Sequence, residues 1–166
     1  GHAQRVADYA VRLGQEIGVS GWDLTWLQVG AYIHDLGNMA VPGEVQGKVN
    51  GLDTDERELM KVHTIMGDSL ARQLDFPAEV RPMVRNHHEH WAGTGYPDRL
   101  VGEEIPLSAR IVTIADVFDA LTSPRSFRGA YPRGEALRVM RRDSARMFDP
   151  QLFEVFEEMV RAEGRL

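Results

Sequence analysis

The stretch DTDERELMKVHTIMGDSLARQL, residues 53–74, shows the pattern that decides the fold class. Its apolar residues recur every three or four positions, which is the spacing of one face of an α-helix. These residues are Leu59, Val62, Met66 and Leu70. His63 falls within the same stripe. We therefore expect an amphipathic helix whose buried side carries a histidine.

The same spacing recurs along the rest of the chain. Helices are expected over about 2–17, from about 23 to the pair at 34–35, in a short segment that ends near 87–88, over about 111–121 and over about 152–160. Residues 37–52 and 91–106 are rich in glycine, proline or polar residues and are predicted to be loops. No segment has a convincing strand pattern, repeat or linker. The prediction is an all-α helical bundle that forms a single domain over residues 1–166.

Composition limits the classes of function. The chain has 166 residues, of which 43% are hydrophobic and 27% charged, as in an ordinary soluble globular protein. No apolar run approaches the roughly 20 residues that span a bilayer, so no membrane insertion is expected and the cytoplasm is the default location. A net charge of −6 argues against a DNA or RNA partner, although a local basic patch could hold a small anion. Because the chain has no cysteine, any metal site must use nitrogen and oxygen ligands.

Several polar residues lie on or beside the apolar stripes of these helices. They are His2, His34, Asp35, His63, His87, His88 and Asp116. A single histidine on an inward face is usually a core residue whose hydrogen bonds are satisfied by its neighbours. Here several helices each carry such a residue, so the same explanation would have to hold for every one of them. Buried imidazoles and carboxylates destabilise a fold unless they have partners. Convergence on metal ions would satisfy all of them together, and helical bundles commonly build metal sites in this way.

The adjacent pair His34-Asp35 suggests more than one metal ion. Neighbours on a helix point about 100° apart, so both can bind metal only if ions lie on different sides of the pair. An aspartate between two ions can bridge them with its two oxygens. Two such ions can activate a water and neutralise a phosphoryl oxygen, which suits phosphoester hydrolysis. The ligand types fit Fe, Mn, Zn or Ni and do not select among these metals.

Six motifs together resemble a known family. They are HAQR (2–5), HDLGN (34–38), VHTIMG (62–67), HHEHWAGTGYP (87–97), RIVTIADVFDALTSPRSFR (110–128) and FDPQLFEVF (148–156). In this order they resemble the HD-GYP subfamily of the HD phosphohydrolase superfamily, over essentially the whole chain. The resemblance implies an all-α domain that hydrolyses cyclic di-GMP, a bacterial second messenger. It also implies two or three divalent metal ions, with iron expected first and manganese or another transition metal as alternatives.

The resemblance assigns roles to individual residues. The implied metal ligands are His2, His34, Asp35, His63, His87, His88 and Asp116, with His34 and Asp35 as the catalytic pair. The implied substrate-binding residues are Tyr96 and Pro97 of the GYP signature, Arg125 and Arg128 on the phosphates, and Asn38. We expect Glu89 to orient a ligand histidine, His90 to be a surface residue and Asp119 to support the site or the adjoining helix.

The chain departs from the family pattern at three places. Asn38 stands where the family usually has lysine, which removes a charge from a phosphate or leaving-group contact. Ala92 stands where the loop commonly has a polar or acidic residue. Members with three metals add a glutamate four residues before the first histidine, and that position lies before Gly1. We therefore expect the chain to be a C-terminal fragment of a longer protein, with an upstream regulatory domain.

Three functions remain open on the sequence. The first is a metal-dependent phosphodiesterase that acts on cyclic di-GMP or a related cyclic dinucleotide, and the complete ligand set favours it. The second is a catalytically weak sensor of the dinucleotide, or a module that docks a diguanylate cyclase through the GYP loop, and Asn38 favours it. A lesser alternative is another HD-type nucleotide phosphohydrolase.

Overall fold

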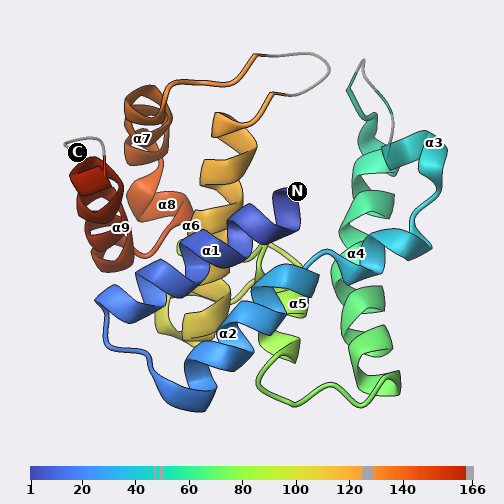
Figure 1. Ribbon diagram of the computed structural model, residues 1–166. Coiled ribbons are helices and arrows are strands. Elements are labelled where there is room, and N and C mark those ends of the chain that lie inside the picture. The colour runs from blue at the N-terminus through green and yellow to red at the C-terminus, as the bar shows by residue number, and fades with distance from the viewer. Residues whose placement is uncertain (47, 49–50, 125–128, 164–166) are drawn as a thin grey trace.

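The protein folds into a bundle of helices, as a computed structural model shows (Figure 1). The structure describes residues 1–46, 48, 51–124 and 129–163. Its helices are α1 (His2–Glu16), α2 (Gly21–Ile33), α3 (Gly43–Gln46), α4 (Thr54–Gln73), α5 (Arg81–Asn86), α6 (Leu107–Thr122), α7 (Arg133–Arg142), α8 (Ser144–Met147) and α9 (Pro150–Glu163), with 3₁₀ turns η1 (Leu36–Ala40) and η2 (Gly102–Glu104). Within the described ranges there is no strand, only an isolated bridge between Ala92 and Val101. The predicted all-α class is confirmed.

The apolar core lies mainly between α1, α6 and α9. Val6 and Leu13 of α1 are fully buried. Phe118 of α6 packs edge-on against Tyr9 and against Phe156, with ring centroids 5.1 Å apart in each pair. Figure 1 shows α7 and α9 on one side of this core and α3 and α4 on the other. The core therefore fixes α1 and α6, which carry two of the predicted site residues.

Helix α4 buries a different face from the one predicted. Its first turn is fixed by a capping box, in which the Glu56 N–H donates to Asp53 Oδ1 and the Asp53 N–H donates to Glu56 Oε2. The buried residues are His63, Thr64, Gly67, Asp68 and Ala71. Of the predicted stripe, Leu59, Val62 and Met66 are each 39% exposed and Leu70 is half-buried. The prediction was right for His63 and wrong for the apolar stripe, which lies on the outside of the molecule.

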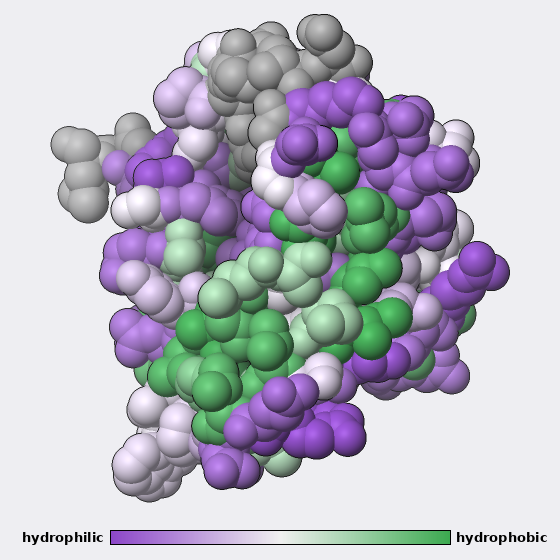
Figure 2. All heavy atoms as spheres, turned by 90° about the vertical axis from the view of Figure 1, so that its right-hand side faces the viewer, coloured by the Kyte–Doolittle hydropathy of each residue, from purple (hydrophilic) through white to green (hydrophobic). Residues whose placement is uncertain are grey.

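Two glycines explain which face of α4 is covered. A Cβ atom at Gly37 in η1 would lie 1.8 Å from the His63 carbonyl oxygen, so no side chain fits there. A Cβ atom at Gly67 would lie 2.7 Å from a methyl group of Val84 in α5. The backbones of η1 and α4 therefore meet at this point, which brings the end of α2 against the middle of α4. Figure 2 views the α4 side of the molecule and shows hydrophobic surface left exposed there.

Other boundaries differ from the prediction in smaller ways. The segment 37–52, expected to be a loop, contains most of η1 and the short α3. Helices α7 and α8 were not predicted. Helix α5 is only six residues long, begins with Pro82 in its first turn and ends just before the histidine pair. In the part of the chain that the structure describes, no helix is long and apolar enough to cross a membrane.

Candidate metal centre

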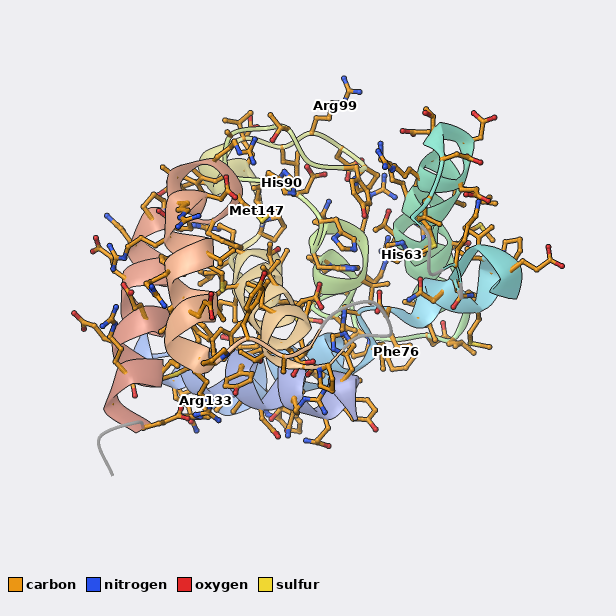
Figure 3. All side chains as sticks on the ribbon, turned by 90° about the horizontal axis from the view of Figure 1, so that it is seen from above. His63, Phe76, His90, Arg99, Arg133 and Met147 are labelled. Atoms are coloured by element: carbon orange, nitrogen blue, oxygen red, sulfur yellow. The ribbon has the colours of Figure 1, made fainter. Side chains whose placement is uncertain are left out.

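The seven predicted ligand residues lie in one cluster, of which His2, Asp35, His63, His88 and Asp116 line a pocket while His34 and His87 are buried beside it. They come from the start of α1, the end of α2, the middle of α4, the end of α5 and the middle of α6; in order they are His2, His34, Asp35, His63, His87, His88 and Asp116. The pocket has a volume of about 560 Å³. In Figure 3, His63 points from α4 into the interior of the bundle. Residues more than 110 positions apart in sequence thus form one cluster.

Asp35 lies between two groups of histidines. Its Oδ1 is 3.6 Å from His63 Nε2 and 3.7 Å from His87 Nε2. Its Oδ2 faces the other way and is 3.6 Å from His34 Nε2. Atoms that share one transition metal at about 2.1 Å lie roughly 3.0–3.4 Å apart, so small adjustments would let each oxygen share an ion with its neighbours. Asp35 is therefore placed where one carboxylate could contact two ions.

Backbone carbonyls hold three of the imidazoles in the orientation that metal binding needs. His34 Nδ1 lies 2.7 Å from the Ala31 oxygen, and His63 Nδ1 lies 2.6 Å from the Met60 oxygen. His87 Nδ1 is 2.8 Å from the Met83 oxygen. Because a carbonyl only accepts, each Nδ1 carries the proton and each Nε2 presents a lone pair.

Those lone pairs have no protein donor that would satisfy them. His34 Nε2 is buried and has no hydrogen-bond partner. His63 Nε2 and His87 Nε2 lie 3.3 Å apart, with both protons already on the Nδ1 atoms. Two facing lone pairs repel each other unless a cation lies beside them. This arrangement fits a bound metal ion and is unfavourable without one.

The other side of the cluster joins α1 to α6. His2 Nε2 is 3.3 Å from Asp116 Oδ1, and His2 Nδ1 is 2.7 Å from Asp119 Oδ2. Asp116 Oδ1 is also 3.9 Å from His34 Nε2. Asp119 accepts from Arg5 as well, at 2.5 Å from Nε to Oδ1. Asp119 therefore orients the His2 ring, and its support of a metal site stays a prediction.

The electrostatic state of the cluster also suits metal binding. Burial lowers the pKa of His34 and of His63, which keeps both imidazoles neutral near pH 7. Burial acts to raise the pKa of Asp35, but the nearby His87 and His34 rings outweigh it and hold that pKa below the usual range. His34, His63 and Asp35 thus offer neutral nitrogens and ionised oxygens, the forms that bind metal. The hydrogen bond to Asp116 raises the pKa of His2 to about 9, so His2 must release a proton to bind an ion.

Two groups of side chains could each hold an ion. One comprises Asp35, His63, His87 and His88, and the other comprises His2, His34 and Asp35; the ligand atoms of each group lie within 4.8 Å of one another. Asp116 completes the second group through its contacts with His2 and His34. Asp35 belongs to both groups. The donor set is nitrogen and oxygen only, which suits Fe, Mn, Zn or Ni.

Comparison with known proteins agrees with this geometry. The model of the HD domain family matches residues 1–152. This chain belongs to the HD domain family. It is 38% identical over 150 residues to a cyclic di-GMP phosphodiesterase response regulator of Xanthomonas campestris, covering 89% of this chain and 40% of that protein. It is 34% identical over 158 residues to a 3′3′-cGAMP-specific phosphodiesterase of Vibrio cholerae, covering 95% of this chain and 34% of that protein.

Solved structures of HD domain proteins share the fold. An HDG"Y"P protein from Bdellovibrio bacteriovorus superposes with a TM-score of 0.79 at 23% identity, covering 96% of this chain and 51% of that one. A cyclic GMP-AMP specific phosphodiesterase from Vibrio cholerae gives a TM-score of 0.75 at 26% identity, covering 96% of this chain and 44% of that one. The GYP motif at 95–97 places the chain with the HD-GYP type. The chain spans less than half the length of the curated relatives named above.

The GYP loop of this HD domain closes one side of the metal centre. The Tyr96 ring stacks on His88 with centroids 4.9 Å apart, and the Tyr96-Pro97 peptide is cis. A Cβ atom at Gly95 would lie 2.4 Å from both the His88 oxygen and the His90 nitrogen, so the loop folds back tightly on the histidine run. Tyr96 lines the pocket of the candidate metal centre and also a second groove.

We call this second space the outer groove. It is lined by Glu58, Lys61, Val62, Ile65, His90, residues 93–97 and Arg99. Pro97 lies here and does not line the metal pocket. His90 is half-buried, lies 3.2 Å from the Thr94 hydroxyl and belongs to neither metal-binding group. It is thus only partly a surface residue, though its exclusion from the ligand set agrees with the prediction.

Glu89 has a different role from the one expected. It is 1% exposed, and its carboxylate accepts hydrogen bonds from the backbone N–H groups of Asp98, Arg99 and Leu100 at 2.7–3.1 Å. The expected role in orienting a histidine was therefore wrong. Three backbone amides converge on this side chain, so Glu89 fixes the loop that follows the GYP motif. Ala92 pairs with Val101 across the same loop.

Of the remaining predicted substrate-binding residues, one lies at the pocket and two lie outside the described residues. Asn38 lines the metal pocket, and its Oδ1 is buried without a hydrogen-bond partner. Arg125 and Arg128 lie outside the described residues. Arg5, which was not singled out, also lines the pocket and pairs with Asp119. Its position three residues after His2 puts it on the same helical face, a signal that could have been used.

Proposed function

We propose that this HD domain hydrolyses a phosphodiester bond of a cyclic dinucleotide, with cyclic di-GMP as the first substrate, as part of bacterial cytoplasmic signalling. The observation that carries the proposal is Asp35, whose two oxygens face two separate sets of histidine nitrogens. The relatives are named as phosphodiesterases for cyclic di-GMP or cGAMP, which supports the same substrate class.

In this proposal the seven clustered residues hold two divalent ions. His63, His87 and His88 hold one, His2, His34 and Asp116 hold the other, and Asp35 contacts both. Such ions supply a water of lowered pKa and positive charge for the phosphoryl oxygens. We propose iron as the first metal, with manganese or another transition metal as alternatives and a third ion as a further possibility outside this ligand set.

The chain's own residues position these groups and the substrate. The carbonyls of Ala31, Met60 and Met83 keep the Nε2 atoms of three histidines directed at the centre. Asp119 does the same for His2. Tyr96 and Pro97 form the wall against which the nucleotide lies, and Asn38 offers a neutral donor at the pocket. Binding of substrate phosphates by Arg125 and Arg128 stays a prediction.

The test is anaerobic purification, reconstitution with Fe²⁺ or Mn²⁺, metal analysis and an assay against cyclic di-GMP. We expect about two equivalents of metal and formation of linear dinucleotide or GMP. Less than one equivalent after reconstitution would contradict the metal centre. Full metal occupancy without hydrolysis of any cyclic dinucleotide would contradict the enzyme.

A sensor of the dinucleotide is the second candidate, because Asn38 places no charge where the family has lysine. Tight binding of cyclic di-GMP by fully loaded protein that does not hydrolyse it would favour this function. Docking of a diguanylate cyclase or of an upstream regulatory domain stays a prediction.

A further inference from the structure

A further pocket lies at the ends of α1, α2 and α5 opposite to those that carry the clustered histidines. Its walls come from the turn between α1 and α2 and from the starts of α2, α5 and α6, and they include Trp26, Glu79, Met83 and Leu107. We call it the basal pocket. Figure 1 shows these segments at the lower end of the bundle, whereas α1 begins higher up. Among the described residues, none lines both this pocket and the metal pocket. The basal pocket is therefore separate from the hydrolytic site.

The basal pocket has the size and the walls of a site for a small molecule. Its volume is about 540 Å³, within the range of roughly 300–1,000 Å³ that ligand pockets occupy. The Trp26 ring stacks on the exposed Trp22, with centroids 5.9 Å apart. Leu107, at the start of α6, is 42% exposed and lines the same space. Apolar walls with an aromatic ring and a few polar groups are typical of such sites. The pocket therefore suits a ligand with an apolar body.

The ionisable side chains at the basal pocket are acidic. They are Asp23 and Glu79, and no basic residue of the described chain lines the pocket. Neither carboxylate forms a hydrogen bond or an ion pair with the residues that the structure describes. Two unpaired negative charges beside an indole attract a cation, because an ammonium group interacts favourably with carboxylates and with the face of an aromatic ring. The pocket therefore fits an organic amine, in which an apolar body carries a protonated nitrogen.

Met83 connects the basal pocket to the candidate metal centre. Its side chain lines the pocket and is 1% exposed. Its carbonyl oxygen lies 2.8 Å from His87 Nδ1 and orients that ring. A Cβ atom at Gly30 would overlap Met83 Cε, so the Met83 side chain also lies directly on α2, one turn before His34. A movement of Met83 would therefore disturb two of the clustered histidines.

The space beside Met83 allows this movement. Methionine is unbranched and adopts several side-chain conformations, but a close-packed interior gives it no room to change. The basal pocket supplies such room on one side of Met83. Helix α5, which carries Met83, has only six residues and therefore few hydrogen bonds of its own. A molecule that fills the pocket would hold Met83 against Gly30, with its carbonyl directed at His87.

We propose that the basal pocket is a regulatory site for a small organic amine, whose binding tightens metal binding through Met83 and His87. The ammonium group lies between Asp23 and Glu79, and the apolar body lies against Trp26 and Met83. The regulatory part of this inference rests on the proposed function, because it requires ions at the clustered histidines. Binding of the amine does not depend on hydrolysis.

The first test measures binding of a probe amine. The probe is 4-phenylbutylamine, and 4-phenylbutanol has nearly the same size without the charge. Each is titrated into Mn²⁺-loaded protein while tryptophan fluorescence is followed, because Trp26 lines the pocket. We expect the amine to saturate at about millimolar concentration and to bind about fivefold more tightly than the alcohol. Glu79→Gln should weaken the amine about fivefold and leave the alcohol within about twofold.

The matched control is Glu16→Gln. Glu16 is an exposed carboxylate next to Ile17 and does not line the basal pocket. Its removal changes the net charge by the same amount and should leave binding of the amine unchanged. Asp23→Asn is a second pocket variant, and it should behave as Glu79→Gln does.

The second test measures the link to the metal centre. Mn²⁺ is titrated calorimetrically into metal-free protein with and without saturating 4-phenylbutylamine. We expect the amine to tighten Mn²⁺ binding about fivefold, at the lower end of typical couplings between sites. Met83→Leu keeps the apolar volume but shortens the side chain, so it should retain the amine and lose most of this gain.

Each outcome supports or overturns one part of the inference. Equal affinity for amine and alcohol, an equal loss in Glu16→Gln, or no saturation at about ten times the expected concentration would overturn the amine site. Amine binding that leaves the Mn²⁺ affinity unchanged would overturn the regulatory link. Hydrolysis of cyclic di-GMP is measured in parallel. Coupled binding of amine and Mn²⁺ by a protein that hydrolyses no cyclic dinucleotide would reject the proposed function and keep the basal pocket, and hydrolysis without amine binding would do the reverse.

Discussion

Asn38 is the residue at which this chain departs most clearly from its family. It lines the metal pocket, and an asparagine offers a phosphate only a neutral donor, about half as strong as a charged one. We expect Asn38→Lys to raise kcat/KM on cyclic di-GMP about tenfold, or about 1.4 kcal/mol of transition-state stabilisation. Steady-state kinetics at fixed metal content measures this.

The control for Asn38→Lys is Met39→Lys. Met39 is the next residue and is 82% exposed, so the same charge is added outside the pocket. An equal gain in both variants would mean that long-range attraction of the anionic substrate is responsible. An unchanged kcat/KM for Asn38→Lys with full metal occupancy would show that this position does not limit the reaction.

Asp35 and His63 should differ in how much metal they hold. Asp35 faces both sets of nitrogens, whereas His63 belongs to one. We expect Asp35→Ala to lose most of both ions and His63→Ala to lose about one, as measured by metal analysis after reconstitution. His90→Ala, outside both groups, should keep its metal. If the Asp35→Ala variant retained two ions, the proposed bridging role of Asp35 would be contradicted.

The loop after the GYP motif depends on one buried carboxylate. Glu89 accepts three backbone N–H groups, and a glutamine there would turn an NH₂ group towards at least one of these donors. We expect Glu89→Gln to reduce the free energy of unfolding by about 3 kcal/mol, from urea titrations. Glu103→Gln, at an exposed position of η2, serves as the control. A loss under about 0.5 kcal/mol would contradict this account.

Asp98 should make the same loop sensitive to acid. The hydrogen bond from Arg85 is the main cause that holds the pKa of Asp98 below its ordinary value of 3.8, and a hydrogen bond from Asn86 adds to it. A depressed folded-state pKa stabilises the fold above pH 3.8, and this stabilisation is lost as pH falls through the lowered value. The stability gap between wild type and Asp98→Asn, from urea midpoints, should therefore shrink below pH 3.8. A gap that stays constant down to pH 2.5 would argue against the ion pair.

Helix α4 shows what periodicity predicts and what it leaves open. The spacing of its apolar residues correctly predicted a helix over 54–73, with His63 inside. It could not tell which stripe is covered, because that depends on the close contact between Gly37 and Gly67, which involves two distant segments. The small residues Gly67 and Ala71, one turn apart on the His63 side, were the available signal.

At the scale of the whole molecule, the prediction from sequence was best for positions at which only a few residue types can perform the chemistry. The seven residues that cluster in the structure could be named from sequence because buried histidine and aspartate demand partners, and their role as metal ligands stays a prediction. Helices α7 and α8 were missed because α7 buries only Ala136, Leu137 and Met140 and α8 has four residues, so neither shows a long apolar period. The role of Glu89 was missed because its partners are backbone amides, which carry no sequence signal.

Metal removal should loosen the bundle as a whole, because the ligands come from five helices or their ends. An ion that binds only the folded state stabilises it by about 2.7 kcal/mol when its free concentration is 100 times the Kd. We expect a chelator to lower the Tm of the wild type by several degrees and to leave Asp35→Ala almost unchanged. Differential scanning calorimetry with and without chelator measures both. In the metal-free protein, the Nε2 lone pairs of His63 and His87 remain 3.3 Å apart without a cation, which adds to the loss. If chelation strips the metal and the Tm does not move, the ions do not brace the helices, and the core of α1, α6 and α9 holds the fold alone.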